Sequence, residues 1–281
     1  MKVLVFGQTG QVARELSAHG AVTTLSRREA NLLYPEACAE AILSRKPACV
    51  INAAAYTQVD RAEEEEQAAT TINAHSPEAM ARACAHLDIP FVTLSTDYVF
   101  DGKGQRPWRE EDPGAPVNAY GRSKYLGEQA VLGSGARALV VRTSWIFSPH
   151  SSNFVKSLLR AGEAKDGYSI IDDQVGGPTP AKSIAAALLS MVSQPLGLTE
   201  QGIYHFSGLP SVSWFEFAQT IFRFAGQDPV LSRISAADYP STTQRPANSR
   251  LDCSKIRDVF NIQQPDWRIN LREVVKECLK S

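Results

Sequence analysis

The sequence predicts an α/β fold in which a doubly wound parallel sheet is followed by a smaller C-terminal α/β unit. Short apolar runs alternate with helical patterns throughout residues 1–145, and this alternation is typical of parallel strands joined by helical crossovers. After Trp145 the alternation is lost, and helical stretches are separated by segments that contain Gly and Pro. The chain has 281 residues, 43% of them hydrophobic, which is enough for one large domain or two smaller ones.

Composition excludes several classes of partner. The net charge is -1 and there is no basic tract, so we expect no nucleic-acid partner. No apolar run approaches the ~20 residues that cross a membrane, and the apolar N-terminus is too short for a signal peptide. We therefore expect a cytoplasmic protein without a membrane partner. Five scattered cysteines without a C-x-x-C pair indicate buried free thiols, and five dispersed histidines indicate no metal site.

The first strand is expected at residues 2–6, a valine-rich apolar run. It leads into residues 7–13, which read G-Q-T-G-Q-V-A, and a helical pattern follows from Arg14. Glycines at such a junction let the backbone turn sharply and approach a pyrophosphate, and the small Ala13 allows close packing of helix on strand. We interpret this turn as the start of a dinucleotide-binding domain.

The second strand, residues 22–25, points to the identity of the dinucleotide. It is followed by Ser26, Arg27 and Arg28, where an acidic residue would bind the adenosine ribose. Two guanidinium groups can instead pair with a 2′-phosphate, which favours NADPH over NADH. The alternative is that both arginines are solvated surface charges.

Two more apolar strands are expected at residues 48–52 and 90–94, and both end in residues suited to a ligand. The first runs into small residues at 53–55, and the second delivers Ser95, Thr96 and Asp97. Hydroxyl groups at this edge of a parallel sheet can hydrogen-bond a substrate oxygen. No G-x-S-x-G motif supports a serine nucleophile. Between the strands, residues 59–87 predict a long helix with a break or restart at Ser76.

Tyr120 and Lys124 form the most informative pair. They follow an irregular, Pro-bearing loop at residues 102–118, and their spacing of four places both on one helix face. We expect the ammonium to lower the pKa of the phenol, so that the tyrosine can exchange a proton. A further strand at residues 138–143 ends at Trp145.

The second half predicts helices at residues 153–162, 182–192 and 213–224 and a short strand at 203–206. We assign residues 1–146 to the dinucleotide-binding domain and 147–281 mainly to a substrate domain, with residues 178–207 returning to the first. The aromatic side chains of 213–224 are expected in a core. Arg245 and Arg250 lie in a Pro-bearing loop and could clamp phosphate, although surface arginines are common.

Seven motifs in this order resemble the extended short-chain dehydrogenase/reductase superfamily, which has a Rossmann-like fold. Within it, nearly the whole chain looks like the dTDP-4-dehydrorhamnose reductase family. The motifs are residues 6–12, 52–60, 95–100, 120–124, 142–145, 173–179 and 245–251.

The resemblance implies that a nicotinamide cofactor reduces the 4-keto group of dTDP-4-dehydro-L-rhamnose to give dTDP-L-rhamnose. By this likeness Tyr120 donates the proton, Lys124 holds the nicotinamide ribose, and Thr96 polarises the carbonyl. The substrate neighbours would be Thr96, Asp97, Trp145, Asn153 and Arg245. The cofactor contacts would be Gly7, Thr9, Gly10, Gln11, Val12, Ser26, Arg27, Asn31, Leu32, Ala54, Ala55, Tyr56, Leu94, Tyr120 and Lys124.

The chain departs from the family pattern at two places. Many relatives carry Asp followed by an apolar residue where this chain has Asn31 and Leu32, and the change removes a carboxylate near the adenosine. Some relatives are magnesium-dependent dimers, but Lys182 stands where a carboxylate would be wanted for a metal. The resemblance thus leaves Mg²⁺ and a homodimer open, and we assign no metal ligands.

Two other hypotheses about the function compete with this one. The chain could be a reductase or epimerase for another nucleotide sugar, because a few pocket residues decide the hexose. It could also be a non-catalytic regulatory subunit, as the methionine adenosyltransferase beta subunit resembles this family. The presence of Thr96, Tyr120 and Lys124 argues for an enzyme.

Overall fold

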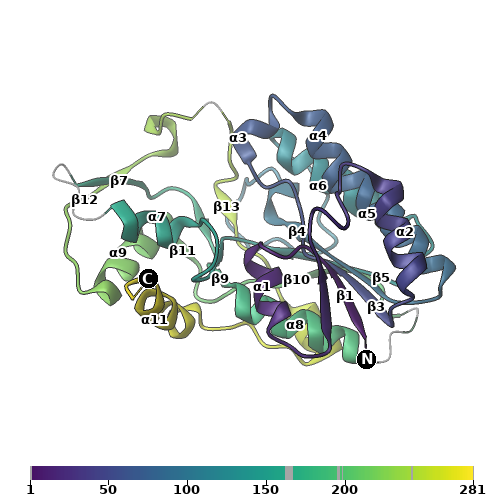
Figure 1. Ribbon diagram of the computed structural model, residues 1–281. Coiled ribbons are helices and arrows are strands. Elements are labelled where there is room, and N and C mark those ends of the chain that lie inside the picture. Colours follow the sequence, from purple (N-terminus) through teal and green to yellow (C-terminus); the bar gives the residue numbers. More distant parts are fainter. Residues whose placement is uncertain (1, 162–166, 195–196, 198, 242, 281) are drawn as a thin grey trace.

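The computed structural model describes residues 2–161, 167–194, 197, 199–241 and 243–280 (Figure 1). Its largest element is a parallel sheet with the strand order β10-β5-β4-β3-β1-β2. The strands are β1 (Val3–Phe6), β2 (Val22–Leu25), β3 (Cys49–Asn52), β4 (Phe91–Thr96), β5 (Ala138–Thr143) and β10 (Gly202–His205). The predicted fold class is confirmed, and all six of these strands were expected within two residues of their observed bounds.

Side chains of one strand point alternately to the two faces of the sheet, and each face has its own core. Val3 and Val5 belong to a core that includes residues of α1 (Gln11–Ser17), α8 (Ala181–Ser193) and α10 (Ser254–Phe260). Leu4 and Phe6 belong to a core that includes residues of α2 (Pro35–Arg45), α5 (Ser76–His86) and α6 (Ala119–Leu132). Helices therefore cover both faces, as a doubly wound sheet requires.

The long helix predicted over residues 59–87 is wrong as one element. The chain forms α3 (Val59–Ala62) and α4 (Glu66–Thr70), followed by the π-helical turn η1 (Thr71–His75) and then α5. The predicted break or restart at Ser76 agrees with a change of helix type there: Pro77 lies in the first turn of α5, directly after the π-helical turn. Helix α2 was not predicted.

A third core lies beside the sheet, on the left of Figure 1. It is built from α7 (Phe154–Ala161), α9 (Trp214–Ala225) and α11 (Trp267–Cys278). Phe215, Phe217 and Phe222 of α9 are buried in it, which confirms their expected role in a core. The predicted helix 153–162 matches α7, but Gly162 lies outside the described residues.

Short strands form three small sheets beside the large one. They are β7 (Tyr168–Ile171) with β12 (Leu231–Ile234), β8 (Val175–Gly176) with β11 (Val212–Ser213) and β13 (Asn248–Ser249), and β6 (Ile146–Phe147) with β9 (Thr179–Pro180). Two short 3-10 turns, η2 (Asp97–Val99) and η3 (Ala236–Asp238), complete the elements. The cysteines are free, and four of the five are buried. Within the described ranges, no helix has the length and apolar character for crossing a membrane.

Candidate active site

The main cleft lies at the carboxyl ends of the parallel strands. Strand β1 pairs with β2 on one side and with β3 on the other, so the crossovers leave it in opposite directions and open a crevice there. The cleft holds about 870 Å³. It is lined by Gly7, Gln8, Thr9, Gly10, Gln11, Val12, Leu25, Ser26, Arg27, Arg28, Ala30, Asn31, Leu32, Ala53, Ala54, Ala55, Thr57, Ile72, Leu94, Ser95, Tyr120, Lys124, Ile146, Ser151 and Ser152.

The glycine turn forms the floor of the cleft. Gly7 has φ +109°, a conformation that side-chain-bearing residues rarely adopt, and its N–H donates to the Leu25 carbonyl at 3.1 Å. A Cβ on Gly7 would lie 3.4 Å from Ala13 Cβ and from the Ala53 backbone. The turn is therefore held between β1, β2 and β3, and its surface is bare backbone that a phosphate group can approach.

A hydrogen-bond network joins this turn to the segment after β6. Gln11 Oε1 accepts from Ser148 Oγ at 2.8 Å and from Asn153 Nδ2 at 3.0 Å. Ser151 Oγ donates to the Thr9 carbonyl at 2.6 Å. Asn153, expected as a substrate neighbour, thus orients Gln11, a residue of the cleft lining. Ser151 and its neighbour Ser152 line the cleft, and no sequence motif had indicated this.

The far end of the cleft carries the residues expected around the adenosine. Arg27 and Arg28 are exposed there. A carboxylate that sequence reasoning missed, Glu29, accepts from the Ser26 N–H at 2.9 Å and from Ser26 Oγ at 2.8 Å. These hydrogen bonds lower the pKa of Glu29. The carboxylate is thereby tied to the chain that follows β2.

Tyr120 and Lys124 lie on α6 at the opposite end. The N-cap side chain of Asn118 accepts from the Gly121 N–H at 2.8 Å and fixes the first turn of the helix. Gly121 lets this turn approach η2 closely, because a Cβ there would come within 2.3 Å of the Tyr98 carbonyl oxygen. Lys124 Nζ donates to the Leu94 carbonyl at 2.7 Å. Both side chains line the cleft, as one helix face predicts.

The expected lowering of the Tyr120 pKa is wrong for this structure. Burial raises the pKa of Tyr120 to about 12, the Thr96 hydroxyl acts against this, and the negative charge of Asp97 adds to it. Burial also lowers the pKa of Lys124 to about 8. The ammonium is directed at the Leu94 carbonyl, and withdrawal of the phenol from water dominates the shift of the Tyr120 pKa.

Thr96 and Asp97 lie at the end of β4, next to Tyr120 but outside the lining of the cleft. Thr96 Oγ1 donates to Asp97 Oδ1 at 3.0 Å. Asp97 is 2% exposed, and its Oδ2 has no hydrogen-bond partner among the described residues. Burial raises the pKa of this carboxyl to about 6. The hydroxyls of Ser249 and Thr96 act against this rise. Since buried polar atoms are nearly always paired, Oδ2 retains capacity for a further donor.

Trp145 follows β5, where the sheet meets the third core. It has φ +48°, and its ring stacks on Trp214 with centroids 3.6 Å apart and planes 12° from parallel. On its edge lies Gly176, where a Cβ would come within 2.7 Å of the indole. The indole is therefore held between a ring and a backbone.

The other residues expected at the substrate or cofactor do not line the cleft. Arg245 forms an ion pair with Asp60 at 2.7 Å, and Arg250 Nε donates to Asn248 Oδ1 at 2.8 Å. The Tyr56 phenol donates to Glu65 at 2.8 Å. The cleft thus collects every predicted cofactor residue except Tyr56, whereas Thr96, Asp97, Trp145, Asn153 and Arg245 lie outside its lining.

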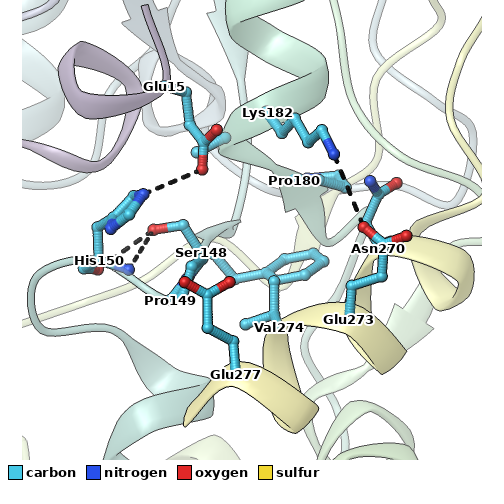
Figure 2. A pocket seen from close by; sticks show the side chains of 12 residues that line it. Glu15, Ser148, Pro149, His150, Pro180, Lys182, Asn270, Glu273, Val274 and Glu277 are labelled. Atoms are coloured by element: carbon cyan, nitrogen blue, oxygen red, sulfur yellow. Dashed lines mark hydrogen bonds and ion pairs between the residues drawn. The ribbon is translucent and has the colours of Figure 1, made fainter. Parts of the chain in front are cut away.

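A second cavity of about 260 Å³ lies between α1, α8 and α11 (Figure 2). Two of its carboxylates lie beside basic side chains: Glu15 Oε1 lies 3.3 Å from His150 Nε2, and Glu273 Oε2 lies 3.7 Å from Lys182 Nζ. No group of three metal-ligating side chains occurs in the part of the chain that the structure describes. A lysine within the donor set does not suit a divalent cation, and we derive no role for Mg²⁺.

Comparisons with known proteins agree with this geometry. A family model described as the RmlD substrate binding domain matches residues 1–280. The chain is 40% identical to a dTDP-4-dehydrorhamnose reductase of Burkholderia thailandensis over 99% of both chains. It is 38% identical to the protein of that name in Sinorhizobium fredii, over 98% of this chain and 97% of the other. It is also similar to the solved dTDP-4-dehydrorhamnose reductase of Bacillus anthracis in complex with NADP, with 31% identity, a TM-score of 0.90 and coverage of 99% and 100%.

Proposed function

The chain belongs to the RmlD substrate binding domain family, and we propose that it is an NADPH-dependent oxidoreductase that reduces dTDP-4-dehydro-L-rhamnose to dTDP-L-rhamnose. Relatives that carry the name of this reductase match the chain over nearly its full length. The observation that carries the proposal is the placement of Tyr120 and Lys124 at one end of an open cleft that begins at the glycine turn.

A nicotinamide dinucleotide fits the cleft. The bare backbone at Gly7 suits the pyrophosphate, and Arg27 and Arg28 suit a 2′-phosphate at the far end. The same class of cofactor is present in the related Bacillus anthracis structure. When bound, the reduced nicotinamide supplies a hydride to the carbonyl carbon of the substrate. The remaining work, which is done by the chain itself, is to bind both ligands and to deliver one proton.

Tyr120 delivers that proton in the proposed reaction. Its raised pKa keeps the phenol protonated at neutral pH, so it is ready to donate to the developing alkoxide. The hydroxyl of Thr96 hydrogen-bonds the same oxygen and polarises the carbonyl. Lys124 carries positive charge beside the phenol, which stabilises the phenolate that remains after the transfer.

The sugar nucleotide is proposed to lie beyond the cleft, between the sheet and the third core. Asp97 Oδ2 accepts a sugar hydroxyl, which pairs the buried oxygen that lacks a partner. Trp145 offers a ring face held rigid by Trp214. Arg245 reaches the diphosphate only after exchanging its ion pair with Asp60. A cytoplasmic location and a homodimer stay predictions, and sedimentation velocity would test the second.

The test is an assay of NADPH oxidation with dTDP-4-dehydro-L-rhamnose and other dTDP-4-keto sugars side by side. We expect the rhamnose precursor to be reduced with the highest kcat/KM. Faster reduction of a different keto sugar would favour the alternative, a reductase for another hexose, and no turnover with any of them would refute the proposed reaction.

A variant pair tests the proton donor. Tyr120→Phe should retain NADPH binding and lose at least about two orders of magnitude in kcat. Tyr125→Phe, a partly buried tyrosine on the same helix, is the matched control and should keep normal turnover. Near-normal turnover of Tyr120→Phe would remove Tyr120 from this role.

A further inference from the structure

Helix α6 carries a third ionisable side chain, Glu128, on the face that bears Tyr120 and Lys124. Glu128 follows Lys124 by four residues, as Lys124 follows Tyr120, so the three side chains form one row. Glu128 is 2% exposed and Lys124 is 5% exposed. A carboxylate buried this deeply is rare unless it is paired.

Glu128 is held by three donors from two strands of the sheet. Arg142 of β5 donates from Nε to Oε1 at 2.9 Å and from Nη2 to Oε2 at 2.6 Å. Ser95 of β4 donates from Oγ to Oε1 at 2.5 Å. The bidentate pair fixes both the place and the orientation of the carboxylate.

Arg142 is itself held from behind. His205 Nδ1 lies 3.1 Å from the Trp108 carbonyl, an acceptor only, so this nitrogen carries the proton. Its Nε2 is then free to accept from Arg142 Nη1 at 3.4 Å. Burial lowers the pKa of His205 to about 3, with the charge of Arg142 as a further cause. The histidine is thus neutral, and the pair Glu128–Arg142 is balanced in charge.

Two tethers connect α6 to the last residues of β4. Lys124 Nζ donates to the Leu94 carbonyl at 2.7 Å, and Ser95 Oγ donates to Glu128. Leu94 and Ser95 directly precede Thr96. The tethers therefore determine how far Tyr120 lies from Thr96, the two residues proposed to hydrogen-bond the same substrate oxygen.

The electrostatic effect of Glu128 reaches Lys124. Burial lowers the pKa of Lys124, and the Glu128 carboxylate is the charge that opposes this. Other ionisable groups on α6 and on the elements packed against it are Tyr120, Arg122, Tyr125, Asp60, Arg61, Glu66, His75, Glu78, Arg82, Cys84, His86, Asp97, Tyr98 and Arg142. Glu66 is paired with Arg122, Arg82 with Glu78, and Asp60 with Arg245.

We propose that Glu128, with its buried partners Arg142 and Ser95, is a positioning device for the reaction: its hydrogen bonds fasten α6 to the ends of β5 and β4, and its charge keeps Lys124 positively charged beside Tyr120. This inference rests on the proposed function. Stability alone is a weak reason for the pair, since apolar residues of similar volume often replace a buried ion pair without loss. A defined distance between Tyr120 and Thr96, together with a charged Lys124, is a benefit that apolar residues could not supply.

The proposed effect of Glu128 on the charge of Lys124 is tested by the basic limb of the pH profile of kcat/KM. Glu128→Gln should move the limb of kcat/KM assigned to Lys124, near pH 8 in the parent chain, down by at least about one pH unit. The double variant Glu128→Gln/Arg142→Met, which leaves no unpaired charge, should move it less but still below the parent value. If Glu128→Gln alone does not fold, the double variant provides the test. A limb that stays at the parent value in the variants that fold would overturn this half of the proposal.

The tether is tested by Ser95→Ala, which removes one hydrogen bond and no charge. We expect kcat to fall by about tenfold, with an unchanged KM and an unchanged pH profile, because a small displacement of Tyr120 slows the chemical step. An unchanged kcat would overturn the inference that the hydrogen bond between Ser95 and Glu128 positions Tyr120. The surface variant Glu78→Gln, which breaks an exposed pair with Arg82, is the control and should leave both kcat and the pH profile unaltered.

Thermal unfolding separates failure of this inference from failure of the proposed reaction. The folded-state pKa of Lys124 lies below its ordinary 10.5, so stability rises with pH between about 8 and 10.5 as the native state loses a proton that the unfolded chain keeps. Without Glu128 this rise begins at a lower pH. The deficit of Glu128→Gln against the parent should therefore be larger at pH 6 than at pH 9. A constant deficit would refute the electrostatic link even if no substrate is turned over.

Discussion

Gly121 controls the contact that brings the proposed proton donor to its place. A Cβ at this position would lie 2.3 Å from the Tyr98 carbonyl oxygen and 3.0 Å from Pro116 Cβ. In Gly121→Ala the first turn of α6 has to move by roughly 1 Å, and a displacement of that size costs on the order of 10²-fold in rate. The overpacked contact should also cost about 1–3 kcal/mol of stability.

The assay for Gly121→Ala combines steady-state kinetics with thermal unfolding at one pH. We expect kcat to fall about 100-fold while NADPH still binds, and the unfolding midpoint to fall by roughly 3–9 °C. Gly20→Ala is the control, since a Cβ on Gly20 meets no atom within 4 Å, and it should leave both quantities unchanged. If Gly121→Ala kept kcat within twofold of the parent, the inferred contact between α6 and η2 would not set the position of Tyr120.

Three further predictions concern the two ligand sites. Arg27→Ala should weaken NADPH binding about tenfold and NADH binding hardly at all, because only NADPH carries the 2′-phosphate; an equal effect in titrations of both cofactors would contradict the assignment. Trp214→Leu, which frees the stacked Trp145 ring, should raise KM for the sugar nucleotide about 3–10-fold with little change in kcat. An unchanged KM would show that stacking on Trp214 does not hold Trp145 for substrate binding. Asp97→Asn should stabilise the protein at pH 7 but not at pH 4. The folded-state pKa of about 6 exceeds 3.8, so stability falls as pH rises between these values, by at most about 3 kcal/mol; parallel unfolding curves across this pH range would disprove the burial argument.

The sheet was predictable because its strands are continuous apolar runs, and burial on both faces selects such runs. Helix α2 escaped prediction because the side chains that it buries include small ones, among them Cys38 and Ala41, which give a weak periodic pattern. The two-residue strand β8 pairs with β11 and β13, far away in the sequence. Pairing of that kind depends on tertiary packing and leaves no local pattern.

The candidate site also has parts that local sequence patterns predict and parts that depend on tertiary packing. The glycine turn and the pair Tyr120 and Lys124 depend on local spacing, and both line the cleft. Ser151 lines the cleft because it hydrogen-bonds the Thr9 carbonyl. This contact joins segments that are distant in the sequence, so residue spacing cannot reveal it. The direction of the Tyr120 pKa was wrong for a related reason, because the depth of burial is a property of the folded chain.

The late return of the chain to the sheet has a consequence for how the protein is made. Val5, Ile51 and Leu139 share one core with Ile184 and Leu188 of α8 and with Tyr204 of β10, so α8 covers this face of the N-terminal strands and β10 extends the sheet. About 60 residues separate the end of β5 from the end of β10, and a ribosome adds them in roughly 3–12 s. During that interval the growing polypeptide presents apolar surface on the sheet face that α8 has not yet covered, the kind of surface that chaperones bind. The N-terminal half therefore completes its folding only after most of the chain has been synthesised.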